Sequence, residues 1–74
     1  MSCEEVARAI EAGIPGAKAT VKDLTGTGDH FSAEVVAPSF EGKSMLAQHR
    51  MVYAALGDAM RGPIHALQLE TKSA

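Results

Sequence analysis

The sequence lacks the features that mark several large classes of protein. Its single cysteine, Cys3, cannot form an internal disulfide, so no disulfide framework holds the fold, which fits the reducing cytosol. No apolar run approaches the roughly 18 residues of a membrane span. No basic segment followed by an apolar run indicates a signal peptide. We therefore expect a cytoplasmic protein without a membrane partner.

An excess of positive charge is also missing. The chain has 7 Lys and Arg against 9 Asp and Glu, a net charge of -2, which gives no general attraction for phosphate backbones. No nucleophile motif is present, and the scattered acidic residues form no catalytic pair. Gly26-Thr27-Gly28 precedes a predicted strand, whereas a phosphate-binding loop needs a helix behind it. We expect a binding protein rather than an enzyme.

The chain does have enough apolar residues, 46%, for one folded domain of residues 1–74. A domain of this size buries only about 60% of the surface that its unfolded chain exposes, which leaves little room for a deep active-site cleft. Ser2-Cys3-Glu4-Glu5 fits a capping box, and the four-residue spacing of the apolar residues that follow predicts a helix ending near Gly13. Alternating apolar residues predict strands over 17–24 and 30–37, joined by a glycine-rich turn.

A long helix is predicted to begin after Ser44 and to end at Gly62-Pro63, before a last strand over 64–71. Residues at helical spacing predict its apolar face: Met45, Leu46, His49, Val52, Tyr53, Leu56 and Met60. The order is therefore α-β-β-α-β, an α+β fold. A right-handed crossover would make the last strand parallel to the second. Both helices then cover one face of a three-stranded mixed sheet.

The three histidines offer the most distinctive chemistry. His30 begins the second predicted strand, His65 begins the third, and His49 lies within the long helix. Neutral imidazole is a common ligand of zinc, copper and iron, although these spacings match no zinc template. Taken singly, each has a simpler interpretation. His49 packs in the core or against the sheet with one ring nitrogen hydrogen-bonded, His30 is a solvated residue at a loop edge, and His65 is a strand residue without a functional role. Two histidines without cysteine partners would suit a shared site, to which another molecule adds the remaining ligands.

A second hypothesis concerns the basic residues around the long helix, which are Lys43, His49, Arg50 and Arg61. They could contact a partner or a nucleic acid. The charges over 39–62 sum to only +1, which is small beside a typical nucleic-acid footprint. A solvated helix face is the simpler interpretation.

Several motifs in order resemble the BolA family. They are Phe40-x-Gly42-x-Ser44, His49-Arg50-x-Val52-Tyr53 and Ile64-His65-Ala66-Leu67, within a match from about Val21 to Leu69. The resemblance implies a fold like a class II KH domain. It also implies a partner, a monothiol glutaredoxin, with which such proteins share a [2Fe-2S] cluster.

In that arrangement the glutaredoxin and a glutathione supply thiolates to the cluster. The BolA-like chain supplies the histidine of its last strand, here His65. It often also supplies a histidine or cysteine from the loop between the first two strands, for which His30 is the candidate. The isolated chain would bind no cluster and would be a monomer or weak dimer.

The resemblance also implies a runner-up, because some family members are DNA-binding regulators. A KH nucleic-acid loop has the form Gly-x-x-Gly. The corresponding stretch of this sequence offers only Gly42 and no second glycine. Nucleic-acid binding therefore ranks second.

Overall fold

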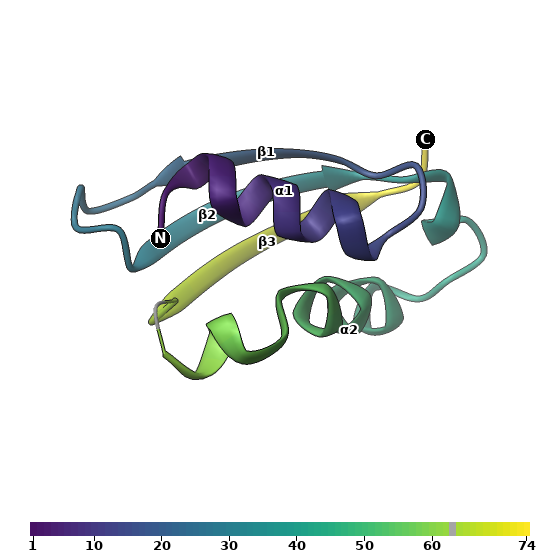
Figure 1. The fold of residues 1–74 in the computed structure, drawn as a ribbon. Coiled ribbons are helices and arrows are strands. Elements are labelled where there is room, and N and C mark those ends of the chain that lie inside the picture. The colour runs from purple at the N-terminus through teal and green to yellow at the C-terminus, as the bar shows by residue number, and fades with distance from the viewer. Residues whose placement is uncertain (63) are drawn as a thin grey trace.

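The secondary structure follows the predicted order α-β-β-α-β, with two added 3-10 turns (Figure 1). The computed structural model describes residues 1–62 and 64–74. The helices are α1 (Cys3–Gly13) and α2 (Met45–Leu56), and the strands are β1 (Lys18–Asp23), β2 (His30–Val36) and β3 (Ala66–Lys72). The 3-10 turns are η1 (Pro38–Phe40) and η2 (Gly57–Arg61).

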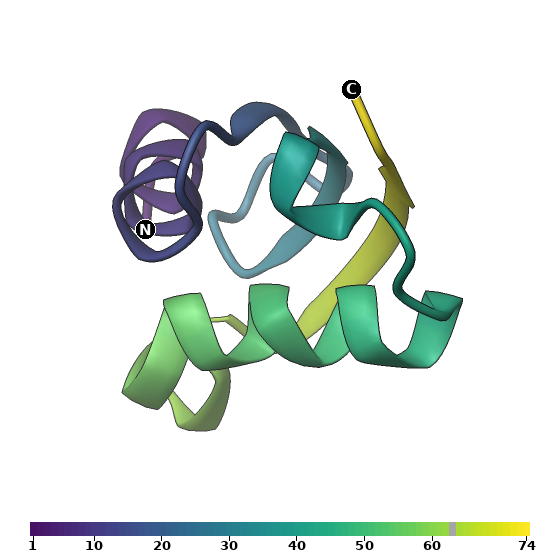
Figure 2. The same ribbon diagram turned by 90° about the vertical axis from the view of Figure 1, so that its right-hand side faces the viewer.

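The three strands form one mixed sheet in the order β1-β2-β3. Strand β1 pairs antiparallel with β2, and β3 pairs parallel with β2, where Phe31 lies opposite Leu67. Figure 1 and Figure 2 show both helices on the same side of this sheet. The predicted α+β fold and the parallel last strand are thus confirmed.

The core lies between the helices and the central strand. Strand β2 buries every second residue, because alternate side chains of a strand point to opposite faces. The buried apolar residues are Val6, Ile10, Ile14, Phe31, Ala33, Val35, Ala37, Phe40, Val52, Leu56 and Ile64. The opposite face of the sheet has no helix over it among the described residues (Figure 2).

Helix α1 begins as its sequence predicts. The Glu5 backbone N–H donates to Ser2 Oγ at 3.1 Å, and the Ser2 backbone N–H donates to Glu5 Oε1 at 2.8 Å. These reciprocal bonds form the capping box. Hydrogen bonding from Ser2, chiefly from its backbone N–H, lowers the pKa of the Glu5 carboxyl.

The long helix ends earlier than predicted. Helix α2 stops at Leu56, because Gly57 adopts φ +55°, a backbone conformation that favours glycine and breaks the helical ladder. The chain continues as the 3-10 turn η2. The predicted terminator Gly62-Pro63 is therefore not where the α-helix ends, and Pro63 lies outside the described residues.

The predicted apolar face of this helix is only partly correct. Val52 and Leu56 are buried, but Met45 is 58% exposed, Leu46 61% and Tyr53 41%. The helix carries apolar residues on more than one side, so spacing alone does not identify the face that packs. Its buried side is set by contact with α1 and β3.

The strand boundaries shift by one or two residues. Strand β1 ends at Asp23, and Leu24 is 49% exposed. Strand β2 stops at Val36, and β3 begins at Ala66 instead of Ile64. Ile64 is buried in the core, so His65 lies in the short connection just before β3 and not within the strand. No helix in residues 1–62 or 64–74 has the length and apolar character to cross a membrane.

Candidate functional site at the histidine pair

His30 and His65 lie side by side, although 35 positions separate them in the sequence. Their ring centroids are 5.4 Å apart, and the ring planes are tilted by 47°. Strands β2 and β3 run parallel with His30 opposite Ala66, so the starts of both strands meet at one end of the sheet. The parallel pairing therefore creates the histidine pair.

The main chain of Asp29 ties the two histidine segments together. Its carbonyl oxygen accepts hydrogen bonds from the His65 N–H at 2.7 Å and from the Ala66 N–H at 3.2 Å. On the other side, the Leu24 N–H donates to the His30 carbonyl at 2.8 Å. Backbone bonds thus hold both histidines in place.

The Asp29 side chain contacts the His30 ring. Its Oδ1 lies 2.8 Å from His30 Nδ1, and the Thr27 hydroxyl donates to the same oxygen. The Thr27 bond and then the His30 bond keep the pKa of the Asp29 carboxyl below its ordinary value of 3.8. Asp29 is therefore an ionised acceptor at neutral pH.

The loop that leads to His30 is organised by a second aspartate. Asp23 Oδ1 accepts from the backbone N–H groups of Thr25 at 3.2 Å and Gly26 at 2.9 Å, and its Oδ2 accepts from Gly28 at 2.9 Å. Neither Asp23 nor Asp29 was predicted as a site residue. The only sequence signal for Asp29 is its position next to His30, which does not reveal the direction of its side chain.

A threonine substitution tests this arrangement. Replacing Thr27 by valine removes the hydroxyl that donates to Asp29, so the pKa of Asp29 should rise toward 3.8. Because the folded pKa lies below 3.8, the stabilising effect of ionised Asp29 is present above that pH. That effect is lost as the pH falls through the folded pKa.

Carbon-13 NMR of the Asp29 carboxyl against pH measures this shift. Thr20→Val is the matched control, since Thr20 is a β1 residue outside this network. An unchanged Asp29 titration in Thr27→Val would contradict the hydrogen bond.

The histidine pair is accessible and is an incomplete ligand set by itself. The His30 side chain is 35% exposed, and His65 is exposed. Within residues 1–62 and 64–74, no group of three or more His, Cys, Asp or Glu is placed to hold a metal ion. Cys3 is half-buried and packs against the core.

The predicted basic residues are spread along α2. Lys43 precedes the helix and Arg61 follows it in η2, so a helix of 12 residues, about 18 Å long, separates them. Arg50 is exposed. His49 is half-buried, and its Nε2 is buried without a hydrogen-bond partner among the described residues. The chain does not gather these four side chains at one point.

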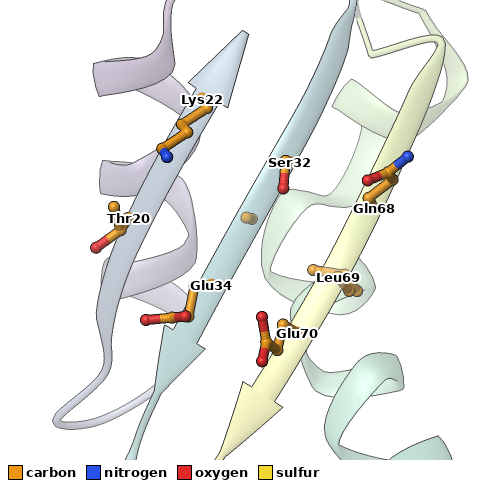
Figure 3. Close-up of a pocket in the computed structure, with 8 residues that line it drawn as sticks. Thr20, Lys22, Ser32, Glu34, Gln68, Leu69 and Glu70 are labelled. Atoms are coloured by element: carbon orange, nitrogen blue, oxygen red, sulfur yellow. The ribbon is translucent and has the colours of Figure 1, made fainter. Parts of the chain in front are cut away.

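The open face of the sheet carries a separate polar hollow of about 420 Å³ (Figure 3). Its strands place Thr20 beside Glu34 and Glu34 beside Glu70. The lining residues are Thr20, Lys22, Ser32, Ala33, Glu34, Gln68, Leu69 and Glu70. Neither His30 nor His65 lines the hollow, so the hollow and the histidine pair are separate features.

Comparison with known proteins identifies the family. The family model described as BolA-like protein matches residues 11–74. BolA-like protein 1 of Bos taurus is 44% identical over 48 residues, which are 65% of this chain and 36% of that protein. The matched segment thus covers about a third of the length of this curated relative.

Solved structures agree with the family model. The structure of a BolA protein homologue from Coxiella burnetii matches with a TM-score of 0.85 and 38% identity, covering 99% of this chain and 91% of that one. The solution structure of yeast Fra2 matches with a TM-score of 0.80 and 31% identity, covering 99% and 80%. By sequence and by fold, this chain belongs to the BolA-like protein family.

Proposed function

We propose that this chain is a non-enzymatic partner of a monothiol glutaredoxin in the assembly, trafficking or sensing of iron–sulfur clusters. In this role His65, together with His30, provides imidazole ligands to a [2Fe-2S] cluster that the two proteins share. The observation that carries the proposal is the accessible histidine pair with ring centroids 5.4 Å apart. The partner follows from membership in the BolA-like family and from what the resemblance of the sequence motifs implies.

The donor set of the pair is compatible with such a cluster. Iron–sulfur clusters are commonly held by cysteine thiolates, and in Rieske centres two imidazoles replace thiolates on one iron. His30 and His65 offer that kind of donor, and the remaining ligands would be thiolates of the glutaredoxin and of glutathione. Bound there, a [2Fe-2S] cluster would supply one-electron redox chemistry at a potential that imidazole ligation raises.

The chemistry of imidazole suits transfer or sensing better than permanent storage. A histidine must lose its proton before it binds a metal, so acidic conditions weaken the site. Both rings lie at an exposed end of the sheet, where a partner can approach them. In the proposed role the polypeptide offers two ligands and a docking point, and it catalyses no reaction itself.

Cluster transfer followed by visible circular dichroism tests the proposal. A monothiol glutaredoxin loaded with a [2Fe-2S] cluster and glutathione is mixed with this chain, and the wild type should change the spectrum. His65→Ala should lose most of that change, because one of the two imidazoles is removed.

The matched control is Gln68→Ala, a substitution on β3 outside the histidine pair. It should behave like the wild type. A spectrum that is the same for His65→Ala as for the wild type would show that His65 is not a ligand.

A further inference from the structure

Asp29 contacts both histidine segments, through different atoms. Its carboxylate oxygen Oδ1 lies 2.8 Å from His30 Nδ1. Its main-chain carbonyl accepts the N–H of His65 at 2.7 Å. Replacing the side chain therefore changes the contact with the His30 ring and leaves the backbone bond to His65 available.

The contact with His30 determines which ring nitrogen carries the proton. An ionised carboxylate has no hydrogen to donate, so it can only accept. The hydrogen bond therefore requires a proton on His30 Nδ1. In a neutral imidazole the other nitrogen, Nε2, then keeps its lone pair.

The carboxylate is itself held in position. The Thr27 hydroxyl donates to the same oxygen of Asp29, and the Thr25 and Thr27 hydroxyl oxygens are 2.5 Å apart. The backbone of this loop is fixed separately by Asp23. In this loop Asp23 therefore fixes the main chain, and Asp29 contacts the ring of His30.

We propose that Asp29 is the positioning residue of the histidine pair, holding His30 in the tautomer whose Nε2 is free to bind a metal. The inference rests on the proposed function, in which His30 is a ligand. Metal-binding histidines commonly donate their second ring N–H to a carboxylate, which orients the ring and makes the ligating nitrogen more basic. Asp29 supplies that carboxylate from the adjacent position in the chain.

The tautomer can be measured in the free chain, without any metal or partner. Long-range proton–nitrogen NMR at alkaline pH, where imidazoles are neutral, should show His30 with a protonated Nδ1 and an unprotonated Nε2. Asp29→Ala should give a mixture of tautomers. Asp29→Asn, which keeps the size of the side chain, should also give a mixture, because an amide donates as well as accepts.

The Asp23→Ala variant distinguishes a specific effect on the His30 ring from a general loss of order in the loop. It removes three bonds to the loop backbone but none to His30, so the His30 tautomer should stay as in the wild type. The inference is overturned if wild-type His30 is not protonated on Nδ1. It is also overturned if Asp29→Ala leaves the tautomer unchanged, or if Asp23→Ala redistributes it equally.

A second readout uses the cluster-loaded glutaredoxin. Loss of a carboxylate behind a metal-binding histidine typically weakens metal binding about 10–100-fold. Titration of Asp29→Ala should show a decrease of that order, and Asp23→Ala a smaller one. If the wild type itself gives no spectral change, the proposed function fails, while the NMR result still decides whether Asp29 sets the His30 tautomer.

Discussion

Replacing Phe31 by alanine is expected to cost about 3–5 kcal/mol of folding free energy, because a large buried ring is removed and the core cannot fully close around the gap. Phe31 is fully buried on the helix-facing side of the central strand. A domain of 74 residues has a total stability of roughly 4–11 kcal/mol, at about 0.05–0.15 kcal/mol per residue. The substitution therefore removes a large share of the stability.

Urea or thermal denaturation followed by circular dichroism measures this loss. In a domain of this size, the melting temperature should fall by about 4–8 °C for each kcal/mol. Leu24→Ala is the control, since Leu24 is 49% exposed beyond the end of β1 and should change stability by about 0.5 kcal/mol or less. Equal effects of the two substitutions would contradict the burial of Phe31.

The Phe31→Ala substitution should also affect the histidine pair. Phe31 follows His30 directly and lies opposite Leu67 in β3, near the end of the sheet at which the histidine pair lies. A variant that unfolds would lose the His30–His65 juxtaposition. Cluster acceptance by Phe31→Ala should therefore decline at the temperature at which the fold is lost.

Replacing Gly13 by alanine should destabilise the domain, although alanine is usually the better helix residue by up to about 1 kcal/mol. A Cβ atom at Gly13 would lie 2.5 Å from the Cβ of Ala55 and 2.9 Å from its Cα. The second of these atoms belongs to the backbone, so α1 and α2 would have to move apart. Overpacking of this kind typically costs about 1–3 kcal/mol.

A double-mutant cycle with Ala55→Gly tests this close approach of the helices directly. Removing the Ala55 methyl relieves the shorter clash but leaves the clash with the α2 backbone, so the double variant should recover only part of the stability. The measurement is the free energy of unfolding of the four proteins in urea. A stabilised Gly13→Ala, or a cycle without coupling between the two sites, would show that the helices do not meet here.

Much of the fold follows from local patterns in the sequence. Helix α1 was predicted from a capping box and a four-residue spacing, and β2 from an alternation that buries every second side chain. Both signals arise from interactions within a few residues, so they can be recognised without the rest of the chain. The end of α2 was predicted less well, because Gly57 terminates it and the stronger signal at Gly62-Pro63 lies further on.

The packing face of α2 required the tertiary structure. Met45, Leu46 and Tyr53 have the spacing of a buried face but are exposed, because α1 and β3 cover a different side of the helix. Hydrophobic spacing indicates which residues can be buried together. It does not indicate which of two apolar sides meets the rest of the molecule.

The histidine site also combines features that the sequence indicates with features that only the tertiary structure decides. The sequence by itself offered three histidines, and the motif resemblance selected His65 and His30 as the proposed ligands, each near the start of a strand. Only the tertiary structure brought their rings within 5.4 Å and set the Asp29 carboxylate against His30 Nδ1. The selection of the residues follows from residue type and from the motif resemblance. Their juxtaposition depends on the parallel pairing of β2 with β3, which joins segments 35 residues apart.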